Sequence, residues 1–100
     1  MVQKIFTIAK ILSVGNSLVI TINKDAVDVL NLKIGDYVQV SIQKLETQKV
    51  KDLAKIIKIG NSIGITIKKD IIEMLSLKEG DFIQYSIVKI EKKESTNKSL

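Results

Sequence analysis

Hydrophobic and polar residues change their spacing along the chain in a readable order. Residues 4–14 are rich in Ile, Val, Phe and Thr, which is typical of a β-strand. The Gly-Asn-Ser sequence at 15–17 then predicts a turn, because Gly and Asn adopt positive φ at low cost. Residues 18–22 predict a second strand, so the two strands form a hairpin or another tight reversal.

The next segment changes to the spacing of a helix. Ala26, Val27 and Leu30 fall on one helical face, and Asp25 lies in the first turn, where the helix dipole favours an acid. We expect this short helix to begin near Lys24 and to end at Asn31. Its counterpart later in the chain is expected to end at Ser76, with an apolar face that holds Ile71, Ile72, Met74 and Leu75. Each helix is followed by a Gly-Asp turn and a strand in which apolar and polar residues alternate.

The whole pattern occurs twice. An offset of 45 residues places residues 3–44 over 48–89, and 22 of these 42 positions are identical. A β-β-α-β unit of this size buries too little apolar surface to be stable alone. We therefore expect two repeats that complete one core. Their bounds are 1–47 and 48–90, followed by a disordered polar tail at 91–100.

Composition excludes several classes of function. The 100 residues contain no Cys and no His, so the chain cannot form a disulfide, a Ser-His-Asp or Cys-His centre or an ordinary zinc site. We expect no enzyme activity, no cofactor and no small-molecule substrate. No apolar run approaches the ~20 residues that span a bilayer, and no signal-peptide pattern begins the chain. We therefore expect a cytoplasmic protein without a membrane partner.

The charge of the chain points to an anionic partner. It has 16 basic and 11 acidic side chains, a net charge of +5, and every basic residue is Lys. Such a surface holds an anion by point charges rather than by bidentate guanidinium contacts. An AT-rich genome is an equally good reason for the missing Arg. The Lys-rich, Cys-free composition is also compatible with a thermophilic archaeon or one of its viruses.

The order of these motifs resembles that of the AbrB/MazE-like swapped-hairpin family, the SpoVT/AbrB domains. It comprises a strand, the GNS turn, I-T-I-x-K-D leading into a short helix, L-x-L-K-x-G-D and an alternating strand, and it occurs in both repeats. The resemblance implies a mainly β fold with two short helices, in which the two β-β-α-β units interleave as a swapped-hairpin barrel. Family members are usually dimers that bind double-stranded DNA. The duplication implies that one chain forms a pseudo-dimer.

The resemblance also implies where DNA binds: the end of the first strand, the GNS turn, the second strand and the start of the helix. In the first repeat these positions hold Lys10, Ser13, Asn16, Ser17, Thr21, Asn23 and Lys24. In the second repeat they hold Lys55, Lys58, Asn61, Ser62, Thr66, Lys68 and Lys69. The family commonly has Arg near Thr21 and Thr66, so strong bidentate readout of guanine is not expected. Turn formation alone is the competing explanation for the Asn-Ser pairs.

The two candidate halves of this face differ in charge. Lys58 and Lys68 of the second repeat stand where the first repeat has Ser13 and Asn23. We therefore expect the second repeat to make the larger share of phosphate contacts. Solvated lysines on an ordinary surface are the alternative explanation.

These observations together favour a DNA-binding transcriptional regulator, bound to DNA or associated with the nucleoid. One chain, or a homodimer of two-repeat chains, would present a pseudo-two-fold face to a pseudo-palindromic site. Two alternatives stay open. One is an antitoxin that represses its own toxin-antitoxin operon, although the short, slightly basic tail argues against it. The other is a low-specificity, chromatin-like DNA-binding protein.

Overall fold

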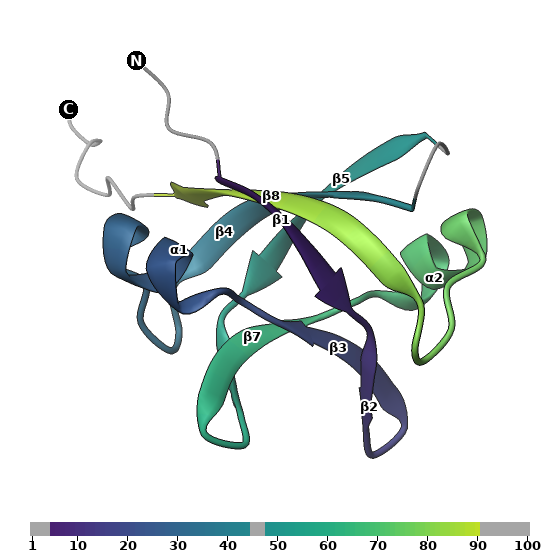
Figure 1. Cartoon of the computed structure of the whole chain (residues 1–100), viewed down its shortest axis with the longest axis horizontal. Coiled ribbons are helices and arrows are strands. Elements are labelled where there is room, and N and C mark those ends of the chain that lie inside the picture. Colours follow the sequence, from purple (N-terminus) through teal and green to yellow (C-terminus); the bar gives the residue numbers. More distant parts are fainter. Residues whose placement is uncertain (1–4, 45–47, 91–100) are drawn as a thin grey trace, which may run out of the picture.

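A computed structural model describes residues 5–44 and 48–90 (Figure 1). The predicted tail at 91–100 lies outside the described residues. The chain is mainly β with two short helices, as its sequence predicts. Its elements are β1 (Ile5–Lys10), β2 (Leu12–Val14), β3 (Ser17–Thr21), α1 (Lys24–Leu30), β4 (Tyr37–Gln43), β5 (Lys49–Lys55), β6 (Ile57–Ile59), β7 (Ser62–Thr66), α2 (Lys69–Leu75) and β8 (Phe82–Ile90).

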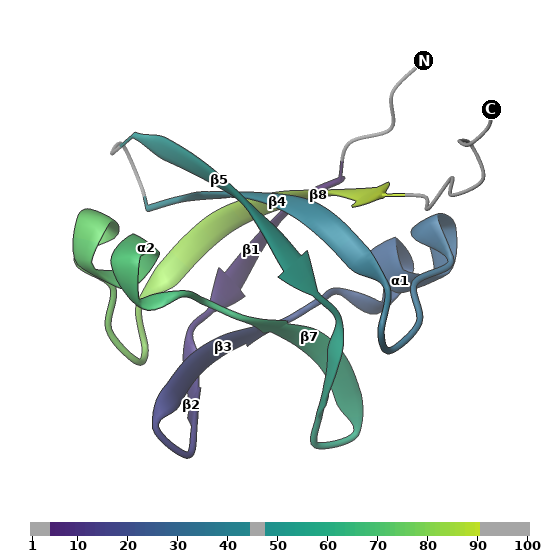
Figure 2. The ribbon, with the colours of Figure 1, turned by 180° about the vertical axis from the view of Figure 1, so that it is seen from behind.

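The strands form two four-stranded antiparallel sheets. The first sheet has the order β1-β8-β4-β5 and the second has the order β2-β3-β7-β6. The first sheet lies across the top of Figures 1 and 2, the hairpins of the second sheet project below it, and one helix lies at each flank. Strands of the two repeats alternate in the first sheet, because β1 pairs with β8 and β5 pairs with β4.

The strand register relates the two repeats by a pseudo-two-fold axis. Ser41 of β4 lies opposite Ser86 of β8, and Ile20 of β3 lies opposite Ile65 of β7. In each pair the partner is the equivalent residue of the other repeat. Two antiparallel strands that pair at equivalent residues are related by a local two-fold rotation. Both sheets share this relation, so the duplication in sequence is a symmetry of the fold.

The first predicted strand of each repeat is broken by one residue. Ile11 separates β1 from β2, and its N–H donates to the Asp81 carbonyl at 2.8 Å while its own carbonyl accepts from the Gly80 N–H at 2.8 Å. Ile56 makes the same two bonds to Asp36 and Gly35. At this residue the chain therefore bonds to the Gly-Asp turn of the other repeat, leaves the first sheet and enters the second.

The Gly-Asp turns are held together by their own acids. The Asp36 carboxylate accepts the Lys33 N–H at 2.8 Å and lies 3.4 Å from Lys89 Nζ. The bond from the Lys33 N–H, followed by the interactions with Lys89, lowers the pKa of Asp36 below its ordinary value of 3.8. The GD motif therefore has a structural role in the turn.

Two lysines connect the repeats at these turns. Lys89 Nζ also donates to the carbonyl of Asn31, where α1 ends, at 2.9 Å. In the other half, Lys44 Nζ lies 3.2 Å from Asp81 and donates to the Ser76 carbonyl at 2.9 Å. Each lysine thus joins the last strand of its own repeat to the helix end and turn of the other. A cation at a helix C-terminus is also favoured by the helix dipole.

The core lies between the sheets and under the helices. The apolar side of the predicted alternation in β4 is confirmed, since Val38, Val40 and Ile42 are buried, but Ser41 between them is buried as well. Both helices end where expected, at Asn31 and Ser76, which adopt left-handed conformations. One expectation was wrong: Met74 is 55% exposed. In the short helix α2 only Ile71 and Leu75 are fully buried. These residues are four apart and lie on the same face of the helix, whereas Met74 lies beside that face.

Candidate nucleic-acid interface

Each GNS sequence forms the two-residue turn of a hairpin. Gly15 and Gly60 have φ of 60° and 59°, and they join β2 to β3 and β6 to β7. The following residues, Asn16 and Asn61, do not have positive φ. This combination is that of a type II′ turn, in which Gly is required only at the first central position. The backbone therefore does not require Asn at 16 or 61, contrary to the reason that the sequence suggests.

Polar side chains at the hairpin ends are exposed and unbonded. Asn16, Ser17, Asn61 and Ser62 are all exposed. Within residues 5–44 and 48–90, none of these four side chains takes part in a hydrogen bond. Both hairpins project from the same side of the molecule (Figures 1 and 2). The arrangement presents two sets of free amide and hydroxyl groups, related by the pseudo-two-fold axis.

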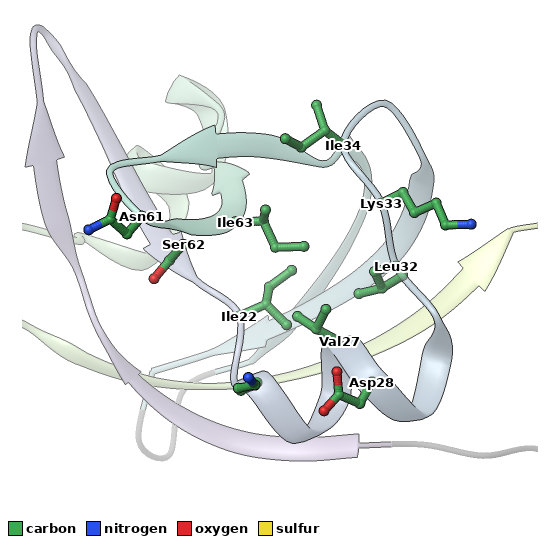
Figure 3. Close-up of a pocket in the computed structure, with 10 residues that line it drawn as sticks. Ile22, Val27, Asp28, Leu32, Lys33, Ile34, Asn61, Ser62 and Ile63 are labelled. Atoms are coloured by element: carbon green, nitrogen blue, oxygen red, sulfur yellow. The ribbon is translucent and has the colours of Figure 1, made fainter.

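A groove lies between each hairpin end and the helix of the other repeat. Figure 3 shows Asn61, Ser62 and Ile63 on one side of a groove of about 430 Å³, with α1 and the turn after it on the other. The equivalent groove, about 510 Å³, lies between Asn16 and Ser17 and the start of α2. Acids line both grooves beside lysines: Asp28 beside Lys24, and Glu73 beside Lys69. The two helix lysines therefore do not form a purely cationic surface.

A second pair of grooves gathers other candidates along the edges of the first sheet. Lys10, Thr21 and Asn23 line a groove beside β1. Lys55, Thr66 and Lys68 line the equivalent groove beside β5. Ser13 and Lys58 are exposed on β2 and β6 and line none of these four grooves. Twelve of the fourteen candidates thus line these grooves, and Thr66 and Lys68 line one groove at a hairpin end and one at a sheet edge.

The two candidates at the residue before each helix have hydrogen-bond or ion-pair partners. The Asn23 side chain accepts the Asp25 N–H at 2.8 Å and so caps α1, while its own N–H donates to the Tyr85 hydroxyl at 2.9 Å. Lys68, at the same position before α2, makes no side-chain cap. Its Nζ instead lies 3.3 Å from Asp52 Oδ1 on β5. These contacts account for both residues without DNA, and their role in binding stays a prediction.

Sequence reasoning missed several exposed side chains on the outer face of the first sheet, the face turned away from the second sheet. Lys49 and Lys51 alternate with half-buried residues on β5 and share this face with Lys55. Tyr37 and Phe82 are exposed there, each with a lysine, Lys55 or Lys10, 6.0 Å from its ring centre. The alternation in KVKDLAK could have identified the lysines. Every second residue of a strand lies on the same face, and Lys stands at three of the four positions on this one.

Comparison with known proteins gave no match: no family model fits the chain, and no curated protein is significantly similar to it. In the described part of the chain, neither helix has the length and apolar character needed to cross a membrane. The same residues contain no cluster of three or more acidic side chains placed to hold a metal ion.

Proposed function

We propose that the chain is a DNA-binding regulator of the AbrB/MazE-like type, in which one chain supplies both halves of the DNA-binding face. One observation carries the proposal: two hairpin ends bear the same exposed Asn and Ser side chains, without partners in the described chain, and are related by a pseudo-two-fold axis. Duplex DNA has the same local symmetry, so a pseudo-palindromic site would place equivalent groups before both ends.

The interleaved strand pairing supports the finer form of this fold. Each repeat contributes its first strand to the edge of the other repeat's last strand, β1 on β8 and β5 on β4. Exchange of this kind is what the swapped-hairpin arrangement requires. We propose that the two sheets, joined through Ile11 and Ile56, are the single-chain form of that barrel.

The side chains that the protein has limit how it could recognise a DNA sequence. The chain has no Arg, so bidentate Arg–guanine contacts are absent. Asn16 and Asn61 can each make a bidentate contact to adenine, whose N7 accepts and whose N6 donates. Ser17, Ser62 and the turn amides suit phosphate oxygens. We therefore propose a site with an adenine in each half, bound mainly through the backbone.

Selection from a random duplex pool at low salt tests the proposal. We expect enrichment of sites with adenine in two related positions, and we expect Asn16→Ala/Asn61→Ala to lose that preference. Gln39→Ala, exposed on β4 in the first sheet, is the control and should bind as the unaltered chain does. Failure of the unaltered chain to retain any DNA at low salt would refute the proposal.

One observation favours a second candidate, low-specificity DNA coating. The outer face of the first sheet carries Lys10, Lys49, Lys51 and Lys55, and the described residues of its strands place no acid there. Such a face attracts phosphates without reading bases. Competition of a selected fragment against bulk genomic DNA separates the two candidates, because coating predicts no preference for the fragment.

A further inference from the structure

The first sheet has two open edges. Its order places β1 and β5 at the ends, and each pairs on one side only, with β8 and β4 respectively. Within the described residues, no backbone hydrogen bond occupies the outer side of either strand. An open edge presents unpaired N–H and C=O groups and can pair with a further strand.

The two edges differ in charge although they are equivalent in the fold. The β5 edge carries Lys49, Lys51 and Asp52, and charged residues on an edge oppose pairing. The β1 edge, IFTIAK, has no charge before its last residue. Ile8, at the centre of the strand, is 68% exposed, the largest exposed fraction among the large hydrophobic residues of the described chain.

The space beside each edge also differs. On the β5 side, the ion pair of Lys68 with Asp52 at 3.3 Å joins the start of α2 to the edge strand. The equivalent residues on the β1 side are Asn23 and Thr7. They line an open groove of about 330 Å³ without bonding to each other, since the Asn23 side chain caps α1. The β5 edge therefore carries several charges and an ion pair to the start of α2, whereas the β1 edge has a single charged residue, Lys10, and borders an open groove.

We propose that two copies of the chain associate by antiparallel pairing of their β1 edges, which joins the two first sheets into one eight-stranded sheet. A second copy suits this edge because a two-fold contact places the uncharged residues 6–9 of the two copies opposite one another. Pairing centred between Thr7 and Ile8 puts Lys10 opposite Ile5 of the other copy, so the lysines do not meet. The proposal goes beyond the proposed function, which requires one chain only.

Sedimentation equilibrium with matched edge variants tests the proposal. We expect the unaltered chain to have twice its monomer mass of 11.1 kDa. Ile8→Lys should raise the dimer dissociation constant at least about tenfold, because it places charge at the centre of the contact. Leu53→Lys makes the same change at the equivalent position of β5 and should leave the dimer intact. Thr7→Asp introduces into β1 the acid that β5 tolerates at this position, and should also give monomers.

Circular dichroism establishes whether each variant is folded. If the Ile8→Lys variant does not fold, the Thr7→Asp variant tests the pairing of the β1 edges in its place. A monomeric unaltered chain at about millimolar concentration would overturn the proposal. A dimer that neither β1 variant weakens would also overturn it. If Leu53→Lys dissociates the dimer as much as Ile8→Lys does, the proposal is likewise overturned, because the copies would then stack through their sheet faces. Hydrogen exchange adds an independent readout: β1 amides should gain protection as concentration rises. None of these measurements involves DNA.

Discussion

At the scale of single residues, Tyr85 distinguishes the two repeats. It is 1% exposed, and its hydroxyl accepts the Asn23 N–H at 2.9 Å. The equivalent residue of the first repeat is Val40, which has no hydroxyl to offer the N–H of Lys68. One polar contact therefore supports the start of α1, and the start of α2 has no such contact.

Tyr85→Phe should lower the free energy of unfolding by about 1 kcal/mol, because the Asn23 N–H loses its partner at a part-buried position. Denaturant titration followed by circular dichroism measures the change. Tyr37→Phe is the matched control: Tyr37 is 42% exposed, so its loss of a hydroxyl should cost less than about 0.5 kcal/mol. Equal effects of the two substitutions would contradict the role given to Tyr85.

Asp36 and Asp81 make stability depend on pH. Both carboxyl groups have pKa values below 3.8, caused first by backbone N–H donation from Lys33 and Lys78 and further by Lys89 and Lys44. A lowered pKa in the folded state means that the stabilisation is complete only above about pH 5, well above the ordinary value of 3.8, and is lost as pH falls through the lowered folded pKa. Asp36→Asn/Asp81→Asn keeps acceptors in both turns but removes the titration.

This double variant should therefore lose stability less steeply than the unaltered chain between about pH 5 and pH 2. Thermal unfolding at a series of pH values measures the slope. Asp25→Asn/Asp70→Asn, in the first helical turns, removes the same number of charges and shows how much of the change comes from net charge alone. An unchanged slope in the Asp36/Asp81 variant would show that the turns do not titrate as described.

At the scale of elements, the two helices begin differently. Asn23 caps α1 through the Asp25 N–H, whereas Lys68 provides no side-chain cap to α2. Asn23→Ala should cost about 1 kcal/mol, the usual value of an N-cap. Lys68→Ala should cost less, because it removes only an exposed ion pair with Asp52. Chemical denaturation of both variants gives the comparison, and a larger loss from Lys68→Ala would be the contrary result.

Local pattern predicted most elements but not how they join. The helix ends at Asn31 and Ser76 and the hairpins at GNS follow from propensities that act within a few residues. The break at Ile11 could not be predicted, because residues 5–14 read as one continuous strand. Its cause is a pair of bonds to Gly80 and Asp81, which are close only in the folded chain.

The candidate site was predictable to the same extent. The doubled motif identified the hairpin ends, but each groove beside them is completed by a helix of the other repeat, as Asn61 and Val27 illustrate. The cap formed by Asn23 and the pairing of Lys68 with Asp52 also depend on tertiary contacts. The sequence shows which residues are polar or charged, but it does not show which residue each of them contacts in the folded chain.

At the scale of the whole molecule, the pseudo-symmetric face is unequal in charge. Lys58 is exposed, and the Lys68 side chain is 58% exposed despite its ion pair. For the proposed binding to DNA, the logarithm of the binding constant falls as the logarithm of salt concentration rises. Lys58→Ala/Lys68→Ala should make this slope shallower by about 1 to 2 units. Ser13→Ala/Asn23→Ala changes no charge and should leave the slope unaltered. Fluorescence anisotropy with labelled DNA across a salt series measures the slope for each double variant. Equal reductions in the two variants would contradict the prediction that the second repeat makes more phosphate contacts.

The pairing of β1 with β8 also has a consequence for synthesis. β1 ends at Lys10, and β8 begins at Phe82. A ribosome that adds 5–20 residues each second needs roughly 4–14 s to make the residues between them. Throughout that interval the first strand has no partner within its own chain, so the first sheet cannot be completed until β8 has been made. The two halves are therefore expected to fold together once β8 has been made, rather than one after the other.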